Sequence, residues 1–147
     1  MIKGGHMFEF LQPVHPKVVH FPVALFITAV GLEAFSWATR KHFFHQCAVC
    51  LYVVAALMTP LIVRTGLWEA ERLRLSHPLL DQHQKYALWT MWVSLMSLPV
   101  LWFLFQKYPK ALRGVFAACL IAVAVVVTFT GDKGGKMVYE YGVGVEP

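Results

Sequence analysis

The sequence predicts an all-α membrane protein, a four-transmembrane-helix up-down bundle with an ordered C-terminal outer segment. Of its 147 residues, 58% are hydrophobic and 14% are charged, whereas a soluble chain carries about 25% charged residues. Four apolar runs, 18–38, 46–68, 86–105 and 112–130, each suffice to cross a hydrocarbon core, which takes about 20 residues. Short links between the runs make neighbouring helices antiparallel.

These runs divide the chain into three parts. We expect an N-terminal outer segment (1–17), a four-helix transmembrane domain (18–130) and a C-terminal outer cap (131–147). The cap is rich in glycine, which permits tight turns, but it also carries more valines and aromatic residues than a disordered tail usually has. We therefore expect residues 137–145 to fold back as a short lid over the outer mouth of the bundle.

Lysines and arginines predict the orientation of the bundle. The links 39–45 and 106–110, with the residues that follow, contain no acidic residue and five basic ones, namely Arg40, Lys41, Lys107, Lys110 and Arg113. Cytoplasmic loops are rich in Lys and Arg, so we expect these links in the cytoplasm. Both termini and the longer loop 69–85 then lie in the periplasm.

The net charge of +5 does not call for a nucleic-acid partner. The basic residues flank membrane spans, where lipid headgroups explain them better. The chain has neither a glycine-rich nucleotide motif nor a serine nucleophile motif. No catalytic residue is indicated, so we expect an electron-transfer subunit rather than a stand-alone enzyme.

Two histidine motifs stand at the outer mouths of the first and third runs. They read His15-Pro16-x-x-x-His20 and His77-Pro78-x-x-x-x-His83. An imidazole in hydrocarbon is costly without a partner, and bundle cores commonly hold cofactors. We expect His20 and His83 to enter the membrane at similar depth on diagonal helices. Facing each other across the core, they would be the two axial ligands of one haem b.

Small side chains follow both of these histidines at helical spacing. The stripe below His20 contains Ala24, Ile27 or Thr28, and Gly31, and the stripe below His83 contains Ala87, Thr90, Ser94 and Ser97. Such stripes let helices approach closely, and they also leave room for a flat macrocycle. The outer pair, His15 and His77, either binds a second haem, supports the first through hydrogen bonds, or caps the helices, because a residue before proline is disfavoured within a helix.

Three arginines on the outer side are candidates for holding haem propionates. Arg64 lies about one turn before the end of the second run, and its alternative is to extend toward lipid headgroups. Arg72 and Arg74 lie in the outer loop. Instead of propionates, they could bind an acidic face of a partner protein.

Other polar residues lie toward the cytoplasmic side. Glu33 is either a functional intramembrane carboxylate or the partner of a basic link residue. We expect His42 and His45 to be interfacial residues of the link, and Cys47 and Cys50 to be small buried residues rather than a redox or zinc motif.

Three stretches together resemble a bacterial family of unknown function, whose members are small, cytochrome-b-like membrane proteins with four helices. The stretches are His15-Pro-x-x-x-His20-Phe-Pro, the Gly66…Ala70…His83 region, and Gly134-Gly135-x-x-Val138-Tyr139-x-x-Gly142-Val143-Gly144-Val145. The resemblance implies a four-helix fold, a b-type haem and association with respiratory proteins in the bacterial inner membrane. The paired His-Pro motifs also suggest an internal duplication, in which His15 corresponds to His77.

The leading functional hypothesis is a b-type haem subunit of a respiratory or related redox assembly. Its haem would lie near the periplasmic face and exchange electrons with a quinone, a periplasmic c-type cytochrome or another redox subunit. One alternative is a cofactor-free structural or assembly subunit. Another is a zinc or copper site formed by His15, His20, His77 and His83.

Overall fold

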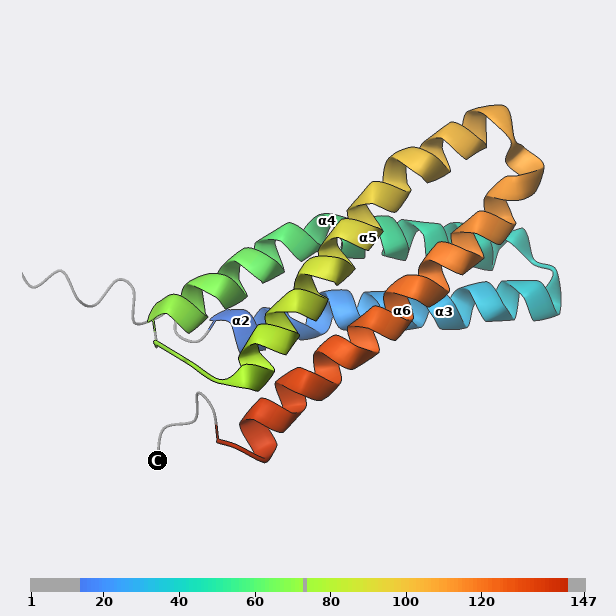
Figure 1. The fold of residues 1–147 in the computed structure, drawn as a ribbon. Helices are drawn as coiled ribbons and strands as arrows, with labels where there is room; N and C mark the ends of the chain where they lie inside the picture. The colour runs from blue at the N-terminus through green and yellow to red at the C-terminus, as the bar shows by residue number, and fades with distance from the viewer. Residues whose placement is uncertain (1–13, 73, 143–147) are drawn as a thin grey trace, which may run out of the picture.

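The computed structural model describes residues 14–72 and 74–142. Within these ranges the chain forms a short helix followed by four long ones, as Figure 1 shows. The helices are α2 (Val14–Val18), α3 (His20–Thr39), α4 (His42–Arg72), α5 (Pro78–Lys107) and α6 (Pro109–Tyr139). All four long helices are long and apolar enough to cross a membrane, which confirms the predicted all-α bundle of four spans.

The ends of these helices follow local backbone chemistry. Helix α3 ends at Thr39, and the C-cap residue after it, Arg40, has a left-handed backbone (φ 58°). Helix α5 begins at Pro78, behind an N-cap in which the His77 ring accepts a hydrogen bond from the Leu79 backbone N–H at 3.2 Å. Pro109 begins α6 immediately after the α5–α6 link, since proline is compatible with the first turn of a helix.

Pro60 lies inside α4 and removes one backbone donor. The carbonyl that this donor would have met belongs to Ala56, and the Thr59 hydroxyl donates to it at 2.7 Å. A freed carbonyl in hydrocarbon would cost several kcal/mol, on the order of a lost buried hydrogen bond. The neighbouring threonine therefore makes the proline tolerable in this span.

The four long helices form two antiparallel hairpins, α3–α4 and α5–α6. Helix α3 packs on α4 and α6, and α5 packs on α4 and α6, so α3 and α5 are diagonal, as predicted. Figure 1 shows the α5–α6 hairpin inclined across the α3–α4 hairpin. We call the end with residues 40–41 and 108 the link end. The opposite end, where α2 and α5 begin and α6 finishes, is the histidine end.

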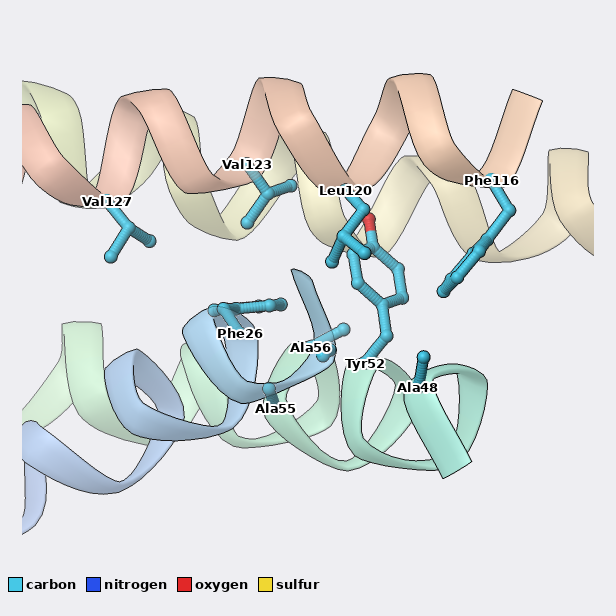
Figure 2. Close-up of a cluster of buried hydrophobic side chains, with 10 residues drawn as sticks. Phe26, Ala48, Tyr52, Ala55, Ala56, Phe116, Leu120, Val123 and Val127 are labelled. Carbon is cyan, nitrogen blue, oxygen red and sulfur yellow. The ribbon is translucent and has the colours of Figure 1, made fainter. Parts of the chain in front are cut away.

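The middle of the bundle is closed by three aromatic rings from three helices. Phe26 and Phe116 each pack edge-on against Tyr52, with ring centroids 5.6 and 5.5 Å apart, as Figure 2 shows. The fourth helix, α5, contributes a hydroxyl: Ser97 lies 2.7 Å from the Tyr52 hydroxyl. Because Ser97 itself donates to the Ser94 carbonyl, Tyr52 is the donor in this contact. The buried phenol is thereby satisfied.

Buried positions in the two hairpins repeat at a constant interval of 68 residues (for example 120 minus 52). This interval relates the buried face of α3 to that of α5, and the buried face of α4 to that of α6. The matched pairs are Pro22 and Thr90, Phe26 and Ser94, Ala29 and Ser97, Ala48 and Phe116, Tyr52 and Leu120, Ala55 and Val123, and Thr59 and Val127. The two hairpins therefore have the register expected of parallel internal repeats.

The C-terminal cap differs from the prediction over the part that the structure describes. Helix α6 continues through the glycines to Tyr139, so residues 131–139 extend the fourth span instead of folding back. Met137 is buried beside Ala70 and Leu80, and this contact explains why the helix persists: the apolar end of α6 packs between the ends of α4 and α5. Residues 143–147 of the expected lid lie outside the described residues.

Candidate functional site

At the histidine end, α2 and α5 bring two imidazoles together. The His15 and His83 ring centroids are 6.5 Å apart, and the ring planes are nearly perpendicular at 82°. Both side chains are partly buried. They come from segments far apart in sequence, so the contact joins the first hairpin to the second. This pair is the site's central feature.

Each of these rings uses Nδ1 to bond a backbone carbonyl on a neighbouring helix. His15 Nδ1 lies 3.1 Å from the Ile62 carbonyl oxygen, and His83 Nδ1 lies 2.9 Å from that of Thr130. A carbonyl only accepts hydrogen bonds, so in both rings Nδ1 carries the proton. In the neutral imidazole Nε2 then has the lone pair, and neither Nε2 is hydrogen-bonded within the described residues. This is the tautomer that metal-ligating histidines commonly adopt.

A glycine lies against each ring. A Cβ atom built on Gly66 would lie 2.8 Å from His15 Cε1, and one built on Gly134 would lie 3.1 Å from His83 Cε1. Both distances are shorter than an ordinary van der Waals contact, so the rings occupy space that any side chain would fill. Gly66 and Gly134 thus leave room for the two histidine rings where they lie. In the sequence, both glycines stand out only through the family resemblance.

We call each histidine ring with the glycine against it a socket. The two sockets are related by the same 68-residue interval that relates the buried positions of the core. It separates His15 from His83 and Gly66 from Gly134 (83 minus 15 and 134 minus 66). Each histidine also bonds the carbonyl 47 residues later in the chain. The predicted duplication thus has a structural counterpart, but its register differs from the prediction. His15 corresponds to His83, not to His77.

The expectation that His20 faces His83 across the core is wrong. His20 is exposed at the start of α3, and so is the small-residue stripe below it, which contains Ala24, Ile27, Thr28 and Gly31. The inward face of α3 instead carries Pro22, Phe26 and Ala29. On α5 the predicted stripe does turn inward, because Thr90, Ser94 and Ser97 are buried.

The remaining predicted site residues, at the same end of the bundle, form no hydrogen bond or ring contact with this pair within the described residues. His77 caps α5, and its ring centroid lies 5.0 Å from that of Tyr141. The capping alternative for His77 is thereby confirmed. Arg64, Arg72 and Arg74 are all exposed. The Arg72 guanidinium stacks over Trp68 at 5.8 Å.

The chemistry of the pair suits an uncharged imidazole. Burial, followed by the nearby His83, lowers the pKa of His15 below its ordinary value, and the bond to the Ile62 carbonyl offsets only part of this. His15 is therefore neutral at neutral pH, and its lone pair is on Nε2. Across residues 14–72 and 74–142, no three His, Cys, Asp or Glu side chains gather as a metal cluster. The four-histidine zinc or copper arrangement is thus not formed.

A second polar cluster, at the link end, is centred on Glu33, which is 3% exposed. Its carboxylate accepts hydrogen bonds from His45 Nδ1 at 2.7 Å, from Trp37 Nε1 at 2.8 Å and from Arg113 Nε at 3.2 Å. The alternative in which Glu33 partners a basic link residue is thus confirmed for Arg113. His45 is 7% exposed, so the prediction that it is an interfacial link residue is wrong. The acid buried on α3 draws this ring inward.

Substituting the glycines tests the sockets. Alanine in a helix is favoured over glycine by about 1 kcal/mol, whereas overpacking costs about 1–3 kcal/mol. We expect Gly66→Ala to lower the thermal unfolding midpoint in detergent, Gly134→Ala to lower it less, and Gly31→Ala, which meets nothing within 4 Å, to leave it unchanged or raise it. A Gly66→Ala protein as stable as Gly31→Ala would show that His15 does not occupy this socket.

Fold and site together define a class of protein: a four-helix membrane protein in which each of two repeated hairpins seats one histidine against a glycine at the same end. The chain belongs to the family described as predicted membrane protein (DUF2231), which it matches over residues 11–147. No curated protein and no solved structure matches it.

Proposed function

We propose that this protein is a b-type haem membrane protein that passes electrons, with His15 and His83 as the two axial ligands. The observation that carries this proposal is the pair of neighbouring imidazoles, 6.5 Å apart and nearly perpendicular, whose Nδ1 atoms both bond to backbone carbonyls. The proposal keeps His83 from the sequence analysis and replaces His20 by His15. A bound haem b supplies one-electron redox chemistry.

The distance between the rings suits two ligands on one metal. An imidazole nitrogen binds a metal at roughly 2 Å, so the two rings are close enough for both residues to hold one iron ion. The observed separation is 6.5 Å. The carbonyls of Ile62 and Thr130 would hold the rings in position and increase their basicity as ligands. Two imidazoles suffice for a haem, whereas zinc would need further protein ligands.

Position favours exchange of electrons at the membrane surface. His83 lies within the first two turns of α5, and His15 precedes the first long helix, so the site is near the water boundary. The candidates to bind the haem propionates are the exposed Arg64, Arg72 and Arg74, because a guanidinium group can donate two parallel hydrogen bonds to a carboxylate. The partner would be a quinone, a periplasmic c-type cytochrome or another redox subunit.

Haem titration of the purified apoprotein tests this function. We expect saturation at one haem per chain, with the low-spin spectrum of two nitrogen ligands, and no stoichiometric binding of zinc or copper under the same conditions. A protein that folds and binds no haem would favour the second candidate, a cofactor-free assembly subunit. Its supporting observation is that every fully buried side-chain N or O among the described residues already has a hydrogen-bond partner.

The orientation is part of the proposal. The link end carries exposed Arg40, Lys41, Lys107 and Lys110, which by the positive-inside rule belong in the cytoplasm. The histidine end and both termini would then be periplasmic in a bacterial inner membrane.

Cysteine labelling in intact cells tests this orientation. In a variant lacking the three native cysteines, an impermeant maleimide should label Asp81→Cys and leave Lys110→Cys unlabelled until the membrane is permeabilised. The opposite pattern would place the histidine pair in the cytoplasm and exclude periplasmic partners.

A further inference from the structure

A cavity of about 550 Å³ lies toward the link end, away from the histidine pair. It is lined by four residues of α4 between 45 and 53, by five residues of α5 between 98 and 105, and by Leu112 and Phe116 of α6. Seven helical residues separate His45 from Tyr52, so the cavity extends roughly 10 Å along the bundle. In Figure 1 the α5–α6 hairpin diverges from α4 in this region.

The lining offers hydrocarbon rather than hydrogen-bonding groups. Most of the lining residues are Val, Leu, Trp, Phe or Pro. The Tyr52 hydroxyl is engaged by Ser97, and His45 Nδ1 is engaged by Glu33. A ligand with a polar ring, such as a quinone, would find few donors here. An acyl chain matches this lining, because an apolar space gains most from burying apolar surface.

The end of the cavity nearest the link, which we call its mouth, has exposed cations close to its lining residues in the chain. Phe105 and Leu112, which line it, flank the link that carries Lys107 and Lys110, and His45 follows Arg40 and Lys41 closely in the chain. All four cations are exposed, and none forms an ion pair with a described side chain. Glu33, the acid at this end, is already bonded to Arg113 and His45. The mouth therefore attracts an anionic group.

We propose that this cavity is a binding site for an anionic glycerophospholipid of the surrounding bilayer. One acyl chain lies between α4, α5 and α6, and the phosphate is held by Lys107 and Lys110. Basic pockets between transmembrane helices bind anionic headgroups in this way. The inference is independent of the haem proposal and of the orientation of the protein.

Native mass spectrometry of the detergent-purified chain tests the headgroup part of this inference. We expect phosphatidylglycerol to bind more tightly than phosphatidylcholine with the same acyl chains. Lys107→Gln and Lys110→Gln should each weaken phosphatidylglycerol binding about fivefold without affecting phosphatidylcholine. Lys85→Gln, at the histidine end, is the control and should change neither. Equal affinity for the two lipids in the unmodified chain, or no loss in the lysine variants, would overturn the headgroup assignment.

Two neighbouring residues of α4 test the chain-binding part. Val53 lines the cavity, whereas Val54 is 44% exposed and is not among the lining residues. Val53→Trp should fill part of the cavity and release bound phosphatidylglycerol, and Val54→Trp should retain it. If both variants retain the lipid equally, the cavity is not the site. Co-purification of a quinone that Val53→Trp releases would overturn the assignment to a phospholipid.

Discussion

Replacing His83 by alanine is expected to abolish the low-spin haem spectrum, and replacing His15 is expected to do the same. Each variant leaves one axial nitrogen, so any retained haem should become high-spin. The two ring centroids lie 6.5 Å apart, so the loss of either ring removes one half of the proposed binding pair. The measurement is the reduced-minus-oxidised spectrum of each variant at equal protein concentration.

His20→Ala is the matched control for this pair. Its ring is exposed at the start of α3, so we expect a full low-spin spectrum after its removal. Loss of the signal in His20→Ala, with retention in His15→Ala, would restore the pairing predicted from the sequence and contradict the one proposed from the structure.

Replacing Arg113 by methionine is expected to destabilise the bundle by about 2–3 kcal/mol, below the usual cost of breaking a fully buried pair because the arginine is partly exposed. Arg113 donates to Glu33 at 3.2 Å and to Ser36 at 2.9 Å. Its removal leaves the Glu33 carboxylate, 4% accessible, with fewer donors. The measurement is denaturant-induced unfolding in detergent.

Two further variants separate this effect from a general loss of charge. Lys110→Met removes an exposed cation from the same end and should change stability little. The double variant Glu33→Leu/Arg113→Met should be more stable than Arg113→Met alone, since no carboxylate is then left short of partners. If the double variant is the less stable of the two, Glu33 contributes to stability by some route other than this ion pair.

The four spans and their diagonal order were predictable because they depend on composition and link length. Apolar runs of sufficient length form helices in a membrane, since no other open structure satisfies the backbone there. The sequence predicted helices shorter than those observed: α4 and α5 extend well beyond the apolar runs, into polar residues such as Glu71 and Asp81. Hydropathy measures what lies in hydrocarbon, whereas a helix continues into water wherever its end can pack.

The inward faces were harder to predict than the spans. In a soluble helix the large apolar residues point inward. In α3, by contrast, at least half of the residue surface is exposed in Phe21, Phe35 and Trp37. Lipid is as apolar as the core, so large residues occupy either face. Small residues occur on both faces too, and the exposed stripe below His20 was therefore indistinguishable from a buried one.

The pairing of His15 with His83 was not predicted from the sequence, for a related reason. The two His-Pro steps invited an alignment of His15 with His77, and proline argued against a helix at either. In the structure Pro16 lies within the short helix α2, which places His15 level with His83. The repeat of 68 residues was present in the sequence as His15-x-Lys17 and His83-x-Lys85. That short match becomes interpretable only when Gly66 and Gly134 are considered. They are separated by the same interval, and each lies against one of the two rings.

One haem b is expected to bind between His15 and His83. The most direct test of this binding is the haem content and optical spectrum of the full chain, purified from membranes of cells supplied with haem. We predict one haem b per chain, released intact by acidified organic solvent, with a low-spin spectrum in both redox states. Folded protein that contains no haem after such expression, and takes up none when haem is added, would contradict the account.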